Sequence, residues 1–568
     1  MSENHTAPAL PADLVDLYAR ARAMGIDDAH VLPYGTDVAK IDLAALNAPG
    51  SKADKARYVV VTAITPTPFG EGKTTTAIGL TQALTQRNKT SILTLRQSSM
   101  GPTFGIKGGA AGNGASQVLP AERMNLHLTG DFHAIAAAHN LLSAVIDNHL
   151  HHGNTLNIDE STITWPRVLD VNDRALRHIV TGLGGKVDGV TRQASFDITA
   201  ASEIMVIMSL ATSLKDLRKR IGNIVIGRNY DGDFITAEQL GAAGAMTVIL
   251  RDALAPNLLR TTEGTPVLVH TGPFGNIATG CSSIIGDLMA ARSGGYVLTE
   301  AGFGADMGAE RFFNLKCVES GMRPHAAVLV VTVRALKAHS GNYELRAGKD
   351  LPEEMLQENV DDVRAGAVNL LKHLDIVRGF GMEPVVAINV FPTDHTSEIA
   401  EVEKIAREAG ARVAQARPVT EGGAGCLELA DAVIEACEAA QGSSPARPLY
   451  EAGQSLREKI EAVATMYGAE GADYTPAAAK RLDAYEKAGF GNLKVVVAKT
   501  PLSLSADPSI KGAPTGFRLP VREVRLAAGA GYVYAICGNL STMPGLPSHP
   551  AAERIDLDIE TGEIQGLR

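Results

Sequence analysis

The feature that most constrains this chain is a glycine-containing loop between a predicted buried strand and a predicted helix. Residues 58–64 are a continuous run rich in β-branched side chains, typical of a strand buried on both faces of a parallel sheet. Ala77, Leu80 and Leu84 then recur at helical spacing, and residues 91–95 predict a second strand. Strand, loop, helix and second strand in this order predict an α/β fold.

The loop itself, TPTPFGEGKTTT at 65–76, has the residues that phosphate binding needs. Gly70 and Gly72 let the backbone approach a phosphate without a Cβ in the way. Backbone N–H groups at the helix start, together with the helix dipole, favour an anion there. The ammonium of Lys73 would contact the β- and γ-phosphates, and the hydroxyl of Thr74 would bind Mg²⁺.

The loop therefore predicts a P-loop-type nucleotide-binding domain. The residues expected to contact ATP are Thr67, Pro68, Phe69, Gly70, Glu71, Gly72, Lys73 and Thr74. The usual pattern begins with glycine where this chain has Thr67. The alternative interpretation is a glycine-rich strand-to-helix turn with a chance Lys-Thr pair.

Arg96 stands directly after the second predicted strand. If that strand is parallel to the first, Arg96 emerges at the carboxyl edge of the sheet, where open α/β sheets bind their ligands. A guanidinium there can hold a phosphate with two hydrogen bonds. The alternative is an ordinary surface ion pair.

The rest of the chain continues the α/β pattern. We predict a helical entry segment over residues 1–56, a helix over 131–150, a linker at 441–448, and strands at 247–250, 326–333 and 385–390. The predicted division is a P-loop nucleotide-binding and catalytic region with a large insertion at 1–375, a second α/β domain at 376–450, and a C-terminal α/β domain at 451–568.

Composition limits the partners and the compartment. Acidic residues outnumber basic ones, 63 to 53, which argues against nucleic acid or an anionic membrane as a partner. No apolar stretch reaches the roughly 18 residues that a transmembrane helix needs. The N-terminus does not have the pattern of a secretory signal, and the five scattered cysteines form no CxxC pair. We therefore expect a cytoplasmic protein.

Several segments share the sequence of one family: PYG at 33–35, TPFGEGKTTT at 67–76, GPTFGIKGGAAGNG at 101–114, NLHLTGDFHAI at 125–135, RVLDVNDRALR at 167–177, TEAGFGADMGAERF at 299–312, TVRALK at 332–337, VAKTPLSLS at 497–505 and TMPGLPSHPAAERID at 542–556. In these segments the chain resembles the formate–tetrahydrofolate ligases, and the likeness runs from about residue 20 to the C-terminus.

The resemblance implies an enzyme of one-carbon metabolism. It implies a P-loop-type domain with additional α/β domains, a homotetramer, and ATP, formate and tetrahydrofolate as substrates. It also implies Mg²⁺ bound with ATP and activation by a monovalent cation, K⁺ or NH₄⁺. In the implied mechanism, formate attacks the γ-phosphate to give formyl phosphate, which then formylates tetrahydrofolate.

The resemblance also implies roles for particular residues. Lys73 and Arg96 match catalytic positions, Arg96 being the arginine that holds formyl phosphate. Phe303 matches the aromatic residue that stacks on the pterin, and Asp131 matches an acid near the folate pocket.

The chain departs from the family pattern at two places. Gln97 and Ser98 follow Arg96, where the family usually has Glu-Pro. The stretch 418–425 matches the part of the family that usually has a tryptophan before a glycine-rich loop, so Val419, or a neighbour, would give the folate pocket only aliphatic contact on that side. Two alternatives to the ligase therefore stay open: a divergent paralogue that activates formate or another small carboxylate for a different acceptor, and a non-catalytic nucleotide-binding regulator.

Overall fold

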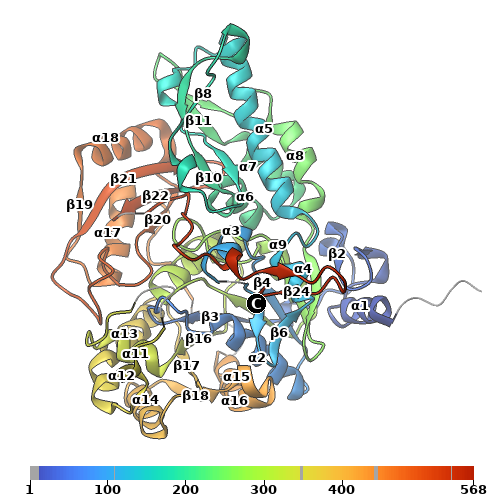
Figure 1. The fold of residues 1–568 in the computed structure, drawn as a ribbon, viewed down its shortest axis with the longest axis vertical. Coiled ribbons are helices and arrows are strands. Elements are labelled where there is room, and N and C mark those ends of the chain that lie inside the picture. Colours follow the sequence, from blue (N-terminus) through green and yellow to red (C-terminus); the bar gives the residue numbers. More distant parts are fainter. Residues whose placement is uncertain (1–11, 108, 346–349, 441–445, 539, 568) are drawn as a thin grey trace, which may run out of the picture.

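A large central sheet organises the molecule (Figure 1). The computed structural model describes residues 12–107, 109–345, 350–440, 446–538 and 540–567. The strand order is β1-β2-β13-β14-β4-β15-β3-β16-β17-β18, and every neighbouring pair from β14 to β18 is parallel. The bounds are β1 Val31–Pro33, β2 Ala39–Ile41, β13 Asn257–Thr261, β14 Pro266–Val269, β4 Ser91–Leu95, β15 Tyr296–Glu300, β3 Arg57–Ala63, β16 Ala326–Val331, β17 Pro384–Asn389 and β18 Arg412–Ala416. The short strands β5 Gly112–Asn113 and β6 Ser116–Leu119 attach through β13.

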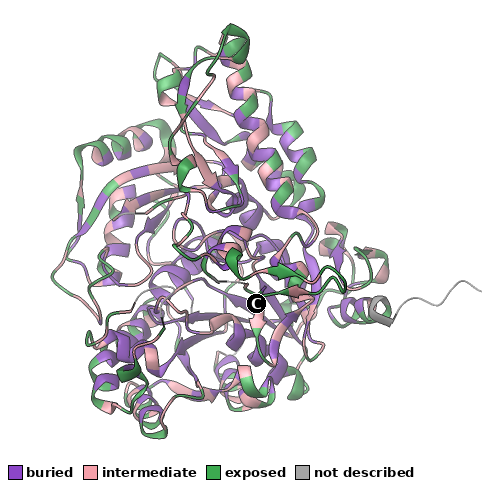
Figure 2. Ribbon diagram, viewed as in Figure 1, coloured by how far each residue is buried: buried purple, intermediate pink, exposed green. Residues whose placement is uncertain are grey.

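Helices cover both faces of this sheet, so its central strands are buried (Figure 2). In β3, Val60 packs into one core while Val59 and Val61 pack into the other, and all three are fully buried. One face is covered by α2 Lys73–Gln86 and α16 Leu427–Ala439. The other is covered by α9 Ile284–Ala291, α11 Val333–His339, α13 Val360–Gly379 and α14 Thr396–Glu408. Burial on both faces explains why β3 has no alternation of polar and apolar residues.

Two further units join the central sheet. The upper unit in Figure 1 contains α5 Asp131–His151, α6 Glu203–Leu210, α7 Leu214–Gly222 and α8 Ala243–Leu250, with the hairpins β8 Ile179–Thr181 to β9 Arg192–Ala194 and β11 Val225–Arg228 to β12 Phe234–Thr236. The C-terminal unit has a sheet in the order β19-β21-β22-β20, with bounds Ala472–Tyr474, Leu519–Ala527, Tyr532–Cys537 and Lys494–Ala498. Helices α17 Leu456–Tyr467 and α18 Pro476–Tyr485 complete its separate core.

The α/β class is confirmed, as are the strands predicted at 58–64, 91–95, 326–333 and 385–390 and the helix at 131–150. The strand predicted at 247–250 is wrong, because these residues end α8. Thr247 and Leu250 face inward there while Val248 is 75% exposed, so the apolar run lies on a helix that is buried on one side only.

The N-terminal prediction is partly wrong, since β1 and β2 follow helix α1 Ala12–Ala23. Residues 441–445 of the predicted linker lie outside the described residues. The central sheet runs on through β17 and β18, across the boundary expected at residue 375, and the domain division stays a prediction. Among the described residues, no helix is both long and apolar enough to cross a membrane.

Candidate active site

The predicted phosphate loop connects the carboxyl end of β3 to the start of α2. Gly72 caps the helix with φ of 66°, and a Cβ at this position would lie 2.3 Å from Asn389 Nδ2, so only glycine fits. No described side chain caps the first turn of α2. The N–H groups of this turn are therefore available to an anion, which the helix dipole also favours.

Glu71 holds the loop from inside the protein. Its buried carboxylate accepts hydrogen bonds from Thr67 N, at 2.6 Å, and from the hydroxyl of Thr332 after β16. Asn389, at the end of β17, donates to Glu71 O at 3.0 Å. Glu71 thus fixes the shape of the loop through bonds within the protein. Thr332, after β16, binds its carboxylate, and Asn389, at the end of β17, binds its backbone carbonyl.

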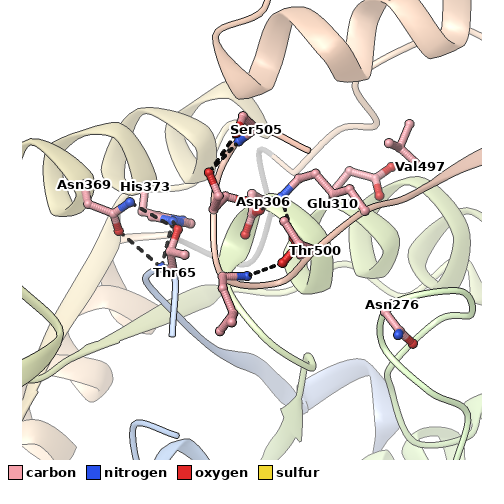
Figure 3. Close-up of polar contacts among 12 residues, drawn as sticks. Thr65, Asn276, Asp306, Glu310, Asn369, His373, Val497, Thr500 and Ser505 are labelled. Atoms are coloured by element: carbon pink, nitrogen blue, oxygen red, sulfur yellow. Dashed lines mark hydrogen bonds and ion pairs between the residues drawn. The ribbon is translucent and has the colours of Figure 1, made fainter. Parts of the chain in front are cut away.

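The base of the loop is held by buried side chains of α11 and α13, and Figure 3 shows those of α13, Asn369 and His373, beside Thr65. Thr65 N donates to His373 Nε2 at 2.9 Å and to Asn369 Oδ1 at 3.2 Å. His339 Nε2 lies 3.0 Å from Thr65 O. Burial lowers the pKa of His373 to about 4, so its imidazole is neutral near pH 7 and accepts the N–H of Thr65 through Nε2.

Opposite charges meet where β3, β15 and β4 end side by side. Lys73 Nζ lies 3.2 Å from Glu300 Oε1, and their side chains are only 12% and 7% exposed. Thr74 Oγ1 donates to both carboxylate oxygens of Glu300, at 3.0 and 3.1 Å. Burial alone would raise the pKa of Glu300, but the charges of Lys73 and Arg96 outweigh it and lower that pKa below its usual value.

Arg96 extends from the end of β4 into the same region. Its guanidinium donates to Pro273 O at 3.1 Å, and a Cβ on Gly302 would lie 3.2 Å from its Nη2. The buried Nε has no hydrogen-bond partner, and Arg96 forms no ion pair with a carboxylate of the described chain. The surface ion pair considered above is therefore not formed, and two cations, Lys73 and Arg96, face the one carboxylate of Glu300. This excess positive charge suits an anion.

Phe303 lies beside these charges, in the turn after β15. Its backbone has φ of 61°, a left-handed conformation that costs a non-glycine residue about 1–3 kcal/mol. Its carbonyl accepts a hydrogen bond from Lys73 Nζ at 3.4 Å, and its ring lies close against Gly275. Phe303, Lys73 and Arg96 are thus brought to one edge of the sheet.

Asp131 has other partners. It begins α5, and its buried carboxylate accepts from Lys40 Nζ and from Asn257 Nδ2, both at 2.8 Å. No hydrogen bond or ion pair connects it to Phe303 or Lys73 among the described residues. The pterin contact expected of Asp131 stays a prediction.

Val419 lies in the short helix α15 Pro418–Glu421, after β18. Its carbonyl accepts from Ala115 N at 2.9 Å, and its side chain lies next to Gly114 of the glycine-rich segment. A Cβ on Gly114 would lie 2.1 Å from the carbonyl oxygen of Val419, so the two segments approach as closely as glycine allows. Its place in a folate pocket also stays a prediction.

Sequence reasoning assigned no role to Glu300, which is central to this site. The signal was present, since Glu300 ends a run of five buried residues, 296–300, and a carboxylate at the carboxyl end of a parallel strand lies at the ligand edge. What could not be predicted was that β15 lies between β3 and β4.

Fold and site together define an α/β protein in which two cations, Lys73 and Arg96, meet one carboxylate at the carboxyl edge of a parallel sheet, the edge where such sheets bind their ligands. The sequence model of formate–tetrahydrofolate ligase matches residues 7–568, and the chain belongs to this family.

Individual relatives are similar over nearly the full length. The chain is 62% identical over 548 residues to a formate–tetrahydrofolate ligase of Cutibacterium acnes, covering 96% of each chain. The identity and coverage are the same for the enzyme of Saccharopolyspora erythraea. The chain is 51% identical over 567 residues to the formate–tetrahydrofolate ligase of Chloroflexus aurantiacus, and the match covers 98% of this chain and 99% of the relative. The family resemblance found in the sequence is thereby confirmed.

Proposed function

We propose that this protein joins formate to tetrahydrofolate at the expense of ATP, giving 10-formyltetrahydrofolate, ADP and phosphate. The observation that carries the proposal is the meeting of Lys73, Arg96 and Glu300 at the end of a phosphate-type loop. A carboxylate and a triphosphate repel each other, so bringing them together requires concentrated positive charge. The full-length likeness to named ligases favours this function over the divergent paralogue and the regulator.

ATP would bind with its phosphates along the loop at 67–74 and the start of α2, as in a P-loop-type domain. The hydroxyl of Thr74 and the carboxylate of Glu300 are adjacent oxygen donors, which are the ligands Mg²⁺ prefers. Thr74 and Glu300 would therefore hold a magnesium ion, which would neutralise part of the phosphate charge. The described residues contain no group of three or more His, Cys, Asp or Glu side chains that could hold a metal ion.

The chemistry has two steps. A formate oxygen attacks the γ-phosphorus and ADP leaves, which gives formyl phosphate. The N10 amine of tetrahydrofolate then attacks the formyl carbon, phosphate leaves, and N10 loses its proton. Lys73 would stabilise the transferring phosphoryl group, and the planar guanidinium of Arg96 would hold the formate and then the formyl phosphate oxygens.

The acceptor half of the site rests on Phe303, whose ring would stack on the pterin. Asp131 and Val419 would contribute to the same pocket. We further propose a homotetramer activated by K⁺ or NH₄⁺, on the family likeness alone.

Formate labelled with ¹⁸O tests this route. Because one formate oxygen becomes bound to phosphorus, each turnover should place one ¹⁸O atom in the released phosphate, as measured by mass spectrometry. Phosphate free of ¹⁸O, with 10-formyltetrahydrofolate formed, would contradict the formyl phosphate step. Absence of any formylated product would contradict the function.

Val419→Trp is expected to lower the KM for tetrahydrofolate by about tenfold. A second aromatic face adds about 0.5–1.5 kcal/mol of stacking, and 1.4 kcal/mol is a factor of ten. The KM for MgATP should not change, because the loop uses other groups. Val419→Leu, which adds aliphatic volume without a ring, is the control. A KM for tetrahydrofolate that is unchanged or higher in the tryptophan variant would show that Val419 does not face a pterin.

A further inference from the structure

A buried ion pair connects the C-terminal unit to the segment that follows Phe303. Lys499 comes directly after β20, and its Nζ lies 2.7 Å from Asp306 Oδ2, with both side chains fully buried. The same ammonium donates to Ser503 O at 2.5 Å and to Thr500 O at 3.2 Å. Figure 3 shows Asp306 and Thr500 in this cluster.

Asp306 belongs to a π-helical turn, Ala305–Ala309, that begins just after Phe303 and Gly304. This segment is folded tightly on itself. A Cβ on Gly304 would lie 2.6 Å from Asp306 Oδ1, and a Cβ on Gly308 would lie 2.0 Å from Gly302 O. A displacement of Asp306 therefore moves the backbone on both sides of Phe303.

The left-handed backbone of Phe303 needs such support, because a residue in this conformation relaxes unless its surroundings hold it. A second bond joins the chain just beyond this turn to β20, because Arg311 Nη2 donates to Val497 O at 2.7 Å. The C-terminal unit thus holds the chain that follows Phe303 at two points, Asp306 and Arg311.

Stability alone does not account for the buried pair. Removing two charges from water costs several kcal/mol per ion, and apolar replacements of buried pairs are often neutral or stabilising. What a buried pair with defined geometry contributes here is a fixed position for Asp306.

We propose that Lys499 is a positioning residue for the folate end of the active site. Through Asp306 it holds Phe303 where its ring can stack on the acceptor and where its carbonyl can bind Lys73. The C-terminal unit thereby becomes part of the site without touching substrate. The inference rests on the proposed function, since it assigns Phe303 to the acceptor.

The test compares Lys499→Met with Lys459→Met. Lys459 is also fully buried in the C-terminal unit, but its Nζ donates to Gly491 O at 3.0 Å and Leu493 O at 2.9 Å within that unit. Lys499→Met should lower kcat/KM for tetrahydrofolate about 10- to 100-fold, and change the KM for MgATP less than about threefold. Lys459→Met should lower the melting temperature and leave both kcat/KM for tetrahydrofolate and the KM for MgATP near their wild-type values. Equal kinetic losses in the two variants would overturn the proposal.

The double variant Lys499→Met/Asp306→Asn separates position from stability. It removes the unpaired carboxylate that Lys499→Met leaves buried, so the melting temperature should recover. The loss in kcat/KM for tetrahydrofolate should persist, and recovery of activity together with stability would overturn the proposal.

Amide hydrogen exchange gives a readout that does not depend on turnover. Exchange over residues 302–309 should be faster in Lys499→Met and in the double variant than in wild type and in Lys459→Met. Unchanged exchange there would contradict the positioning role. Absence of formylated product from wild type would contradict the proposed function instead.

Discussion

Lys73→Ala is expected to lower kcat by about 100-fold or more. Lys73 is the first residue of α2, beside the loop predicted to hold the phosphates, and its ammonium lies 3.2 Å from Glu300. Its removal takes away charge stabilisation of the transferring phosphoryl group and leaves the buried carboxylate of Glu300 without its ion-pair partner. The rate of 10-formyltetrahydrofolate formation at saturating substrates measures the loss.

Lys404→Ala is the matched control, because Lys404 is 58% exposed and only 4.0 Å from Glu401. This variant should retain wild-type kcat, since surface ion pairs contribute little. Activity of Lys73→Ala close to that of Lys404→Ala would rule out the phosphate-loop assignment.

Arg96→Lys is expected to reduce formate-dependent turnover by about 100-fold, with less than a threefold change in MgATP affinity. Lysine keeps the positive charge but loses the planar fork, and the guanidinium of Arg96 already uses one nitrogen on Pro273 O. The remaining nitrogens, including the unpartnered Nε, are the ones available for a carboxylate or an acyl phosphate. Turnover and ATP binding should be measured separately, by steady-state kinetics and by calorimetry with a non-hydrolysable nucleotide.

Arg87→Lys provides the comparison. Arg87 forms a bidentate salt bridge with Asp431 on the surface, with distances of 2.8 and 2.5 Å. Arg87→Lys therefore makes the same chemical change far from the site. Its kinetics should match wild type. If MgATP affinity collapsed in Arg96→Lys while turnover of bound ATP survived, Arg96 would be a nucleotide ligand.

The sequence predicts the centre of the fold well, because the central strands are buried on both faces. A continuous apolar run such as 58–64 then has few alternatives, and the glycine pair at Gly70 and Gly72 defines the turn into α2. At α8 the same kind of signal misled, since four apolar or β-branched residues in a row fit either a strand or the end of a helix.

Contacts between segments that are distant in the chain could not be predicted from the sequence. Glu300 contacts Lys73 only because β15 lies between β3 and β4 in the sheet. The order of strands in a sheet cannot be predicted from the local periodicity of the sequence. The pair of Lys499 and Asp306 joins segments 193 residues apart. Asp131 is a further example, because nothing in the neighbouring sequence indicated that Lys40 would bind its carboxylate.

ADP release from MgATP, measured with no addition, with formate, with tetrahydrofolate and with both, distinguishes the ligase from the alternatives. We predict sustained release only when formate and tetrahydrofolate are present together, with one 10-formyltetrahydrofolate formed per ADP. Formate-dependent release without any formylated folate would indicate a different acceptor. ADP release that neither substrate changes would contradict the assignment as a formate–tetrahydrofolate ligase.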